Sequence, residues 1–171
     1  MPPAVADRVR IPTRKEQLPI LFPSNAVDVT IVFFDSSAFV KLLVDEEGTE
    51  LAVALWDHCD AAVSSRLAYP EVGAALGAAR RAGRLDARQL RGVEREWEIY
   101  WAATRVVAMT DAVARSAAQL CRSHALRAGD GVHLASALAL GSAEAADLVF
   151  ASWDKRLADG ASDAGLRVAP A

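Results

Sequence analysis

Two features that many proteins depend on are missing from this sequence. The 171-residue chain contains no uninterrupted run of about 18 or more apolar residues, so we expect no transmembrane helix and no membrane partner. Cysteine is scarce, and the two that occur, Cys59 and Cys121, have the spacing neither of a metal site nor of a disulfide framework. We interpret both as core thiols of a cytoplasmic protein.

The chain also lacks an excess of positive charge and the motifs of several enzyme classes. Its formal net charge is −3, so RNA binding would need a local basic patch or a bound cation. A glycine-rich phosphate loop is absent, which excludes nucleotide hydrolysis of the P-loop type. The histidines, His58, His124 and His133, are scattered over helical stretches, so cleavage by a histidine pair has no support. For His133, one helical turn after Asp130, we favour a structural role over a hydrogen bond near a site.

Proline is concentrated at the N-terminus. Five of the seven prolines fall in the first 23 residues, a segment with no regular period and without the long apolar core of a signal peptide. We expect residues 1–27 to form an irregular tail, and a natural start at Val29 or Val32 is an alternative that the pattern leaves open.

From residue 28 to residue 171 the sequence alternates between short apolar runs and stretches with a helical period, as one domain with a sizeable core would. The apolar runs predict strands at 29–34, 61–64, 105–109, 147–152 and 166–169. Helices are expected at 37–44, 49–59, 66–82, 86–103, 111–126 and 130–140, with a short one after Asp154. This alternation predicts an α/β fold with a largely parallel sheet of four to five strands covered on both faces.

Acidic residues stand close to where the predicted strands end. Asp35 follows the first strand directly, and Glu71 lies in the opening turns of the helix after the second. Asp130 opens a later helix, and Asp154 follows the fourth strand. Because the functional crevice of an open parallel sheet lies beyond the carboxyl ends of its strands, we expect these carboxylates to gather at one edge.

Each acid also has a purely structural explanation. Aspartate is a favoured N-cap, and a carboxylate stabilises the positive end of a helix by about 0.3–1 kcal/mol. Asp111, after Thr110 at the start of a helix, needs no other explanation. Taken singly, Asp130 and Asp154 suit capping and metal binding equally well. Glu71 lies past the cap position in an otherwise apolar segment, and four acids at one edge are more than capping requires.

A cluster of carboxylates calls for a cation, since without one the groups repel one another and some stay protonated. Hard oxygen ligands suit Mg²⁺ or Mn²⁺, which keep several waters and also bind phosphate oxygens. Such an ion makes water a better nucleophile and stabilises charge on a phosphoryl group. The sequence therefore predicts a metal site at Asp35, Glu71, Asp130 and Asp154.

The acids stand in motifs that resemble those of the PIN-domain ribonucleases of the VapC toxin type. The resemblance runs from about Val29 to the C-terminus and is carried by four stretches in order: 35–48, 64–72, 130–137 and 152–166. In the third motif of the family, the residue after the aspartate is more often alanine than the Gly131 found here. We expect this glycine to loosen the start of its helix slightly.

The resemblance implies a three-layer α/β/α PIN-like fold with the sheet order 3-2-1-4-5. It also implies a Mg²⁺-dependent endoribonuclease that cuts structured RNA, a tRNA or an rRNA, with Asp35, Glu71, Asp130 and Asp154 as the metal ligands. Ser36 and Ser152 would serve as hydroxyl partners, an interpretation that competes with local backbone hydrogen bonds. The implied partners are a cognate VapB-like antitoxin and a second copy of the chain, and the alanine-rich helices also favour a homodimer.

Basic residues cluster at the predicted turn between two helices, namely Arg80, Arg81, Arg84 and Arg88. The default interpretation is a solvated face paired with the interleaved acids, and the alternative is a patch that contacts RNA or the antitoxin. The aromatic residues Trp97, Tyr100 and Trp101 follow on the second helix, as core residues or as a groove for a partner helix.

Two other functions remain as alternatives. A receiver-like phosphoacceptor would need a lysine at the end of a late strand, and 166–169 supplies none. A non-catalytic PIN-fold module that only binds RNA or protein would have lost some of the acids, whereas all four are present.

Overall fold

A sheet of five parallel strands in the order β3-β2-β1-β4-β5 forms the centre of the molecule. The computed structural model describes residues 30–140 and 148–170. The strands are β1 (Ile31–Phe34), β2 (Ala61–Ser65), β3 (Arg105–Val107), β4 (Leu148–Ala151) and β5 (Arg167–Ala169). The predicted strand order is confirmed.

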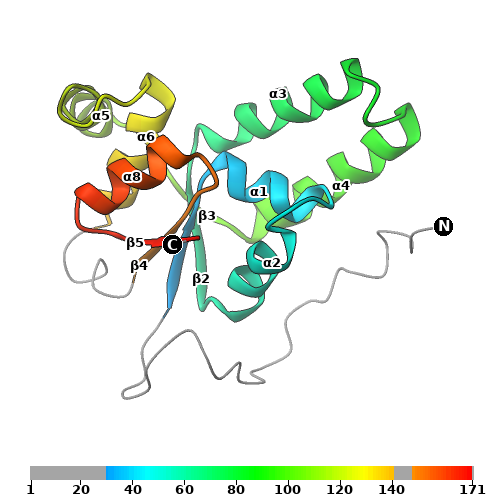
Figure 1. The fold of residues 1–171 in the computed structure, drawn as a ribbon, viewed down its shortest axis with the longest axis horizontal. Coiled ribbons are helices and arrows are strands. Elements are labelled where there is room, and N and C mark those ends of the chain that lie inside the picture. The colour runs from blue at the N-terminus through cyan, green and yellow to red at the C-terminus, as the bar shows by residue number, and fades with distance from the viewer. Residues whose placement is uncertain (1–29, 141–147, 171) are drawn as a thin grey trace.

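Helices cover both faces of this sheet. In the described ranges they are α1 (Ser36–Leu43), α2 (Thr49–His58), α3 (Ala68–Arg81), α4 (Ala87–Ala103), α5 (Asp111–Ser123), α6 (Ala128–Leu138) and α8 (Lys155–Asp163). Figure 1 shows α1 to α4 on one side of the sheet and α5, α6 and α8 on the other. The expected three-layer α/β/α fold is confirmed, and none of these helices is long and apolar enough to cross a membrane.

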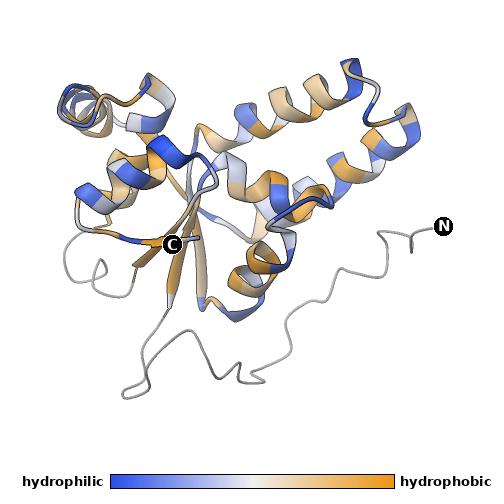
Figure 2. Ribbon diagram, in the orientation of Figure 1, coloured by the Kyte–Doolittle hydropathy of each residue, from blue (hydrophilic) through white to orange (hydrophobic). Residues whose placement is uncertain are grey.

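The alternation of side chains along β1 explains why both faces are covered. Val32 and Phe34 pack into the core formed with α1 to α4, whereas Phe33 packs into the core formed with α6 and α8. Phe33 also stacks on Phe150 of β4, with ring centroids 5.1 Å apart. Figure 2 shows the apolar strands of the sheet between the two layers of helices. A strand that is apolar on both faces needs such cover on each side.

The structure shifts several predicted boundaries. The predicted tail, 1–27, and the strand positions Val29 and Asp147 lie outside the described residues. Helix α6 begins at Ala128, so Asp130 is its third residue and not its first. The predicted turn between α3 and α4 is confirmed, and Gly83 adopts the left-handed φ of 71° that glycine accommodates without strain.

The fold creates a crevice beside β1. Strand β1 lies between β2 and β4, and the helices that follow these strands lie on opposite faces of the sheet. Such a reversal leaves an opening beyond the carboxyl ends of the central strands. Asp35 is the first residue past the end of β1 and therefore stands at this opening.

Candidate active site

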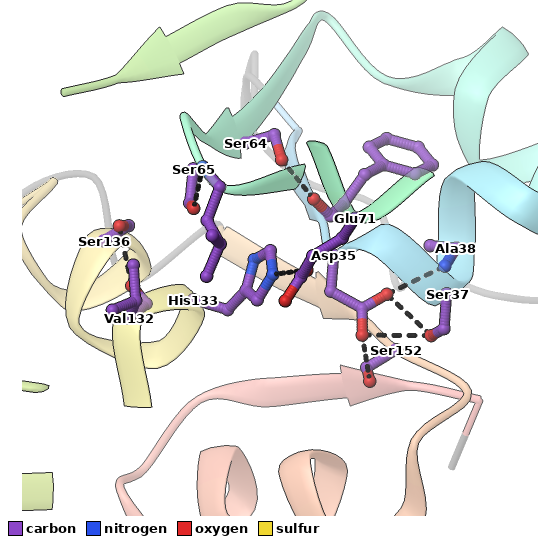
Figure 3. A network of polar contacts seen from close by, with 12 residues as sticks. Asp35, Ser37, Ala38, Ser64, Ser65, Glu71, Val132, His133, Ser136 and Ser152 are labelled. Atoms are coloured by element: carbon purple, nitrogen blue, oxygen red, sulfur yellow. Dashed lines mark hydrogen bonds and ion pairs between the residues drawn. The ribbon is translucent and has the colours of Figure 1, made fainter. Parts of the chain in front are cut away.

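Asp35 is the most deeply buried acid of the site. It is the N-cap of α1, where its Oδ1 accepts a hydrogen bond of 2.8 Å from the Ala38 N–H. The Ser37 hydroxyl donates to the same carboxylate at 2.7 Å, and the Ser152 hydroxyl donates to Oδ2 at 2.7 Å (Figure 3). Asp35 is therefore a capping residue, as one of the two interpretations predicted, and its carboxylate is held by hydrogen bonds from α1 and from Ser152, the residue after β4.

Burial dominates the electrostatics of Asp35. Only 2% of the residue is exposed, and this burial raises the pKa of its carboxyl above 3.8, although nearby His133 and the hydrogen bonds from Ser37, Ala38 and Ser152 oppose the rise. Neither lysine nor arginine forms an ion pair with Asp35 in the described part of the chain. The carboxylate is thus buried without a lysine or arginine beside it to neutralise its charge.

Glu71 reaches the same opening from the first turns of α3. Its Oε2 lies 2.7 Å from Nε2 of His133, a residue of α6 that is 2% exposed. Burial alone raises the pKa of Glu71, but the hydrogen bond and charge of His133, together with the Ser36 hydroxyl, hold that pKa below its ordinary value. Ser36, predicted as a hydroxyl partner, therefore contacts an acid of the site.

Asp130 and Asp154 each stabilise the start of a helix. Asp130 Oδ2 accepts a hydrogen bond of 3.1 Å from the Arg127 N–H and lies 3.4 Å from Nε of Arg156. Asp154 is the N-cap of α8, where its Oδ1 accepts from the N–H groups of Arg156 and Leu157. Within the described residues, Asp130 Oδ1 and Asp154 Oδ2 make no hydrogen bond. In each of these two acids the capping role occupies one carboxylate oxygen.

Ser152 joins two of these acids. Its hydroxyl donates to Asp35 and accepts a hydrogen bond of 3.2 Å from the Asp154 N–H. Ser152 thus makes both a hydrogen bond to a predicted site acid and a local hydrogen bond to the backbone. Ser152 therefore ties the end of β4 to the end of β1.

All four predicted acids lie at the carboxyl edge of the sheet, but they do not form a complete ligand set. In residues 30–140 and 148–170, no group of three or more histidine, cysteine, aspartate or glutamate side chains is placed to hold one metal ion. By chemistry the donors fit a hard divalent cation, since they are carboxylate oxygens and include Asp35, which is buried without a lysine or arginine partner in the described residues. A cation would supply the positive charge that this carboxylate lacks.

A cleft of about 360 Å³ opens beside these acids. Its walls include Glu71 and the hydroxyl-bearing residues Ser36 and Ser37, together with Val40, Lys41, Glu46, Ala75 and Trp153. Lys41 and Glu46 form an ion pair of 3.0 Å in one wall. The cleft is thus continuous with the site and carries more acid than base.

Sequence reasoning missed three residues of the site. Ser37, and not Ser36, contacts Asp35, and His133 contacts Glu71 although a structural role was favoured for it. Trp153 was treated only as part of a motif and lines the cleft. The sequence contained two signals for these contacts: a serine two residues after the strand-end Asp35, and a histidine three residues after Asp130.

The structure moves the predicted cap of α5 from Asp111 to Thr110, and the role of the arginine patch stays a prediction. Asp111 is an exposed first residue of α5 paired with Arg115 at 2.8 Å, and the cap itself is Thr110. The arginines at the tip of the α3–α4 hairpin, Arg80, Arg81, Arg84 and Arg88, are exposed, and in the described ranges none forms an ion pair. A rise of 1.5 Å per residue places this patch about 15 Å along α3 from Glu71.

Comparison with known proteins identifies the family. A family model described as PIN domain matches residues 32–161. The chain belongs to the PIN-domain family. Ribonuclease VapC45 and Ribonuclease VapC49, both from Mycobacterium tuberculosis, are 60% identical to this chain over 141 residues, which is 82% of this chain and 96% of each relative. This PIN domain is therefore of the VapC type.

A solved structure supports the fold of this PIN domain independently. PAE2754 from Pyrobaculum aerophilum superposes with a TM-score of 0.52 at 19% sequence identity, covering 82% of this chain and 84% of that one. Likeness at this level of identity shows the shared fold alone.

Proposed function

We propose that this VapC-type PIN domain is a Mg²⁺-dependent endoribonuclease that acts as a toxin in the cytoplasm, with Mn²⁺ as an alternative ion. The observation that supports this most is Asp35, a buried carboxylate without a lysine or arginine partner in the described residues, at a sheet edge shared with Glu71, Asp130 and Asp154. The relatives carry the word ribonuclease in their names, which supports RNA as the substrate.

The proposed mechanism divides the work among these side chains. Asp35, Glu71, Asp130 and Asp154 would hold the ion, which when bound activates a water and stabilises charge on the phosphoryl group. Hydrogen bonds from Ser37, Ala38 and Ser152 keep the Asp35 carboxylate in one orientation. His133 does the same for Glu71, and the capping bonds do so for Asp130 and Asp154. The residues are thus oriented before substrate arrives, which favours catalysis by positioning.

Cleavage in vitro tests the activity. Purified protein incubated with total tRNA and rRNA should produce discrete fragments with Mg²⁺ and none with EDTA. Asp154→Asn should yield none in either buffer, while keeping its fold because asparagine also caps helices. Sequencing the new RNA ends after induction in cells would then identify the target, which we propose is a structured tRNA or rRNA. Equal cleavage with and without EDTA would refute the metal dependence.

The proposed partners are a VapB-like antitoxin and a second copy of the chain. A groove of about 490 Å³ between α3 and α4 suits an amphipathic or extended segment of the antitoxin, because its lining combines the apolar Tyr69, Leu76 and Trp97 with charged side chains, namely Arg91, Glu94, Arg95 and Glu98. Trp97 is 4% exposed and belongs mainly to the core, the first of the two interpretations given for the aromatic residues of α4.

Growth assays and light scattering test these partners. Induction should arrest growth, a co-expressed cognate antitoxin should restore it, and Tyr69→Asp should weaken that rescue without weakening the arrest. Light scattering at micromolar concentration should give the mass of a dimer. A monomer, or rescue unaffected by Tyr69→Asp, would contradict the corresponding half of this proposal.

A further inference from the structure

The indole of Trp153 has an unusual position beside the site. Trp153 stands in the chain between Ser152, which donates to Asp35, and Asp154, which caps α8. Its half-buried side chain borders the 360 Å³ cleft that Glu71 and Ser36 also line. An aromatic surface is therefore placed directly next to the acidic edge.

Two contacts hold Trp153 in this position. Its backbone N–H donates a hydrogen bond of 2.8 Å to the Ser37 hydroxyl, which itself donates to Asp35. The pyrrole side of its ring lies against Gly48, where an added Cβ would overlap Trp153 Nε1 and the backbone has a φ of 92°. Glycine at position 48 thus provides both the turn and the space for the indole, so that the ring is positioned before any ligand binds.

The charges around the cleft favour an uncharged ligand group. Glu46 and Glu71 contribute negative charge, and Lys41, the one base that lines the cleft among the described residues, is paired with Glu46 at 3.0 Å. A phosphate would be repelled here, whereas a flat aromatic group with polar edges could stack on the indole and meet the Ser36 and Ser37 hydroxyls. Nucleobases have these properties, and aromatic side chains commonly bind unpaired bases by stacking.

We infer that Trp153 forms the floor of a nucleobase subsite that binds an unpaired base of the RNA next to the bond that is cut. This inference rests on the proposed ribonuclease function. It adds that recognition includes a base flipped onto Trp153, so that bases and not only the phosphate backbone contribute to affinity. The volume of the cleft is in the range of small-ligand pockets, which accommodates one base.

Substitutions at Trp153 can test this without disturbing the acids. The hydrogen bond to Ser37 comes from the backbone of Trp153, so any side chain at this position retains it. Trp153→Phe keeps a smaller ring and Trp153→Leu removes aromaticity while filling space beside Gly48. Ile99→Ala, which shortens an exposed side chain of α4 outside the cleft, is the matched control.

The probe is a short fluorescein-labelled oligoadenylate RNA, compared with an abasic ribose–phosphate oligomer of equal length. Affinities are measured by fluorescence anisotropy before any product appears on a denaturing gel. Wild type and Ile99→Ala should bind the oligoadenylate about tenfold more tightly than the abasic oligomer. Trp153→Leu should bind both equally, and Trp153→Phe should be intermediate. All variants should melt within a few degrees of wild type, which separates loss of stacking from loss of fold.

The outcomes distinguish failure of the subsite from failure of the function. If wild type cleaves RNA and Trp153→Leu retains the full preference for bases, the subsite is wrong and the ribonuclease function stands. A Trp153→Leu variant that loses affinity for both oligomers alike would also refute base stacking. If wild type neither binds nor cleaves RNA, the proposed function fails and the subsite with it.

Discussion

His133 on α6 and Glu71 on α3 meet across the acidic edge, with Nε2 of the imidazole 2.7 Å from Oε2 of the carboxylate. The two residues are 62 positions apart in the chain. For the imidazole to donate to an ionised Glu71, Nε2 must carry a proton, while the buried Nδ1 has no hydrogen-bond partner among the described residues. Glu71 is thereby held as a carboxylate facing the opening beside β1.

The first prediction concerns this hydrogen bond. Replacing His133 by Leu removes the donor to Glu71 and should lower the free energy of unfolding at neutral pH by about 1–2 kcal/mol, a value reduced because the Glu71 side chain is 34% exposed. His133→Gln keeps an N–H near the same place, so its free energy of unfolding should fall by less than that of His133→Leu. Urea denaturation of the three proteins measures this. Equal losses for Leu and Gln would show that packing, and not the hydrogen bond, is what matters.

The same contact has a pH dependence with a defined sign. The pKa of Glu71 is lowered in the folded protein below 4.5, so the contact stabilises the fold above pH 4.5, where the unfolded chain has also lost the proton. This contribution disappears as the pH falls through the folded pKa. The stability difference between wild type and His133→Leu should therefore shrink below pH 4.5, and a difference that grew on acidification would contradict the assignment.

Asp35 should show the opposite sign. Burial raises its pKa above 3.8, so between pH 3.8 and the raised pKa the folded protein holds a proton that the unfolded chain has released. Stability from this group therefore falls as the pH rises through that window and stays lower above it. In EDTA at neutral pH, Asp35→Asn should be more stable than wild type, since asparagine retains the cap, and the advantage should vanish below pH 3.8. An advantage independent of pH would refute the electrostatic explanation.

Divalent ions should make wild type more stable than Asp35→Asn, the reverse of their order in EDTA. An ion that binds only the folded state at about 100 times its Kd adds about 2.7 kcal/mol to stability. Mn²⁺ should therefore raise the Tm of wild type and raise that of Asp35→Asn much less. Titration calorimetry of the same pair should show weaker Mn²⁺ binding by the variant. Identical affinities would remove Asp35 from the ligand set.

Gly131 tests a packing relationship between α5 and α6. A Cβ at this position would overlap Cys121 Sγ and lie 2.9 Å from the Ala117 carbonyl oxygen. Gly131→Ala should therefore destabilise the protein by about 1–3 kcal/mol despite the higher helix propensity of alanine. Adding Cys121→Ala should restore part of the loss by removing the sulfur. A stabilised Gly131→Ala protein would instead support the expectation from the sequence that this glycine only loosens the helix.

The fold class and the residues at the strand ends were predictable from the sequence, whereas the side-chain contacts between helices were not. The β-rich run at β1 and the alternation with helical stretches were sufficient for the fold class, and the positions of Asp35 and Asp154 at strand ends placed them at one edge. The Glu71–His133 pair and the Gly131–Cys121 contact depend on how α6 packs against α3 and α5, and a periodicity contains no information on packing. The start of α6 was predicted at Asp130, two residues too late, because the cap of this helix is Arg127, a residue that capping preferences do not predict.

RNA cleavage by Asp130→Asn, compared with Asp111→Asn, tests most directly whether the carboxylates at the sheet edge form a catalytic metal site. Asparagine can still accept the hydrogen bond from the Arg127 N–H, so the fold and Tm should be retained in the first variant. The second variant changes an exposed acid of α5 that only pairs with Arg115. We predict that Asp130→Asn abolishes Mg²⁺-dependent RNA cleavage and growth arrest while Asp111→Asn retains both. Full cleavage by the Asp130 variant, or its loss in the Asp111 variant, would contradict this account.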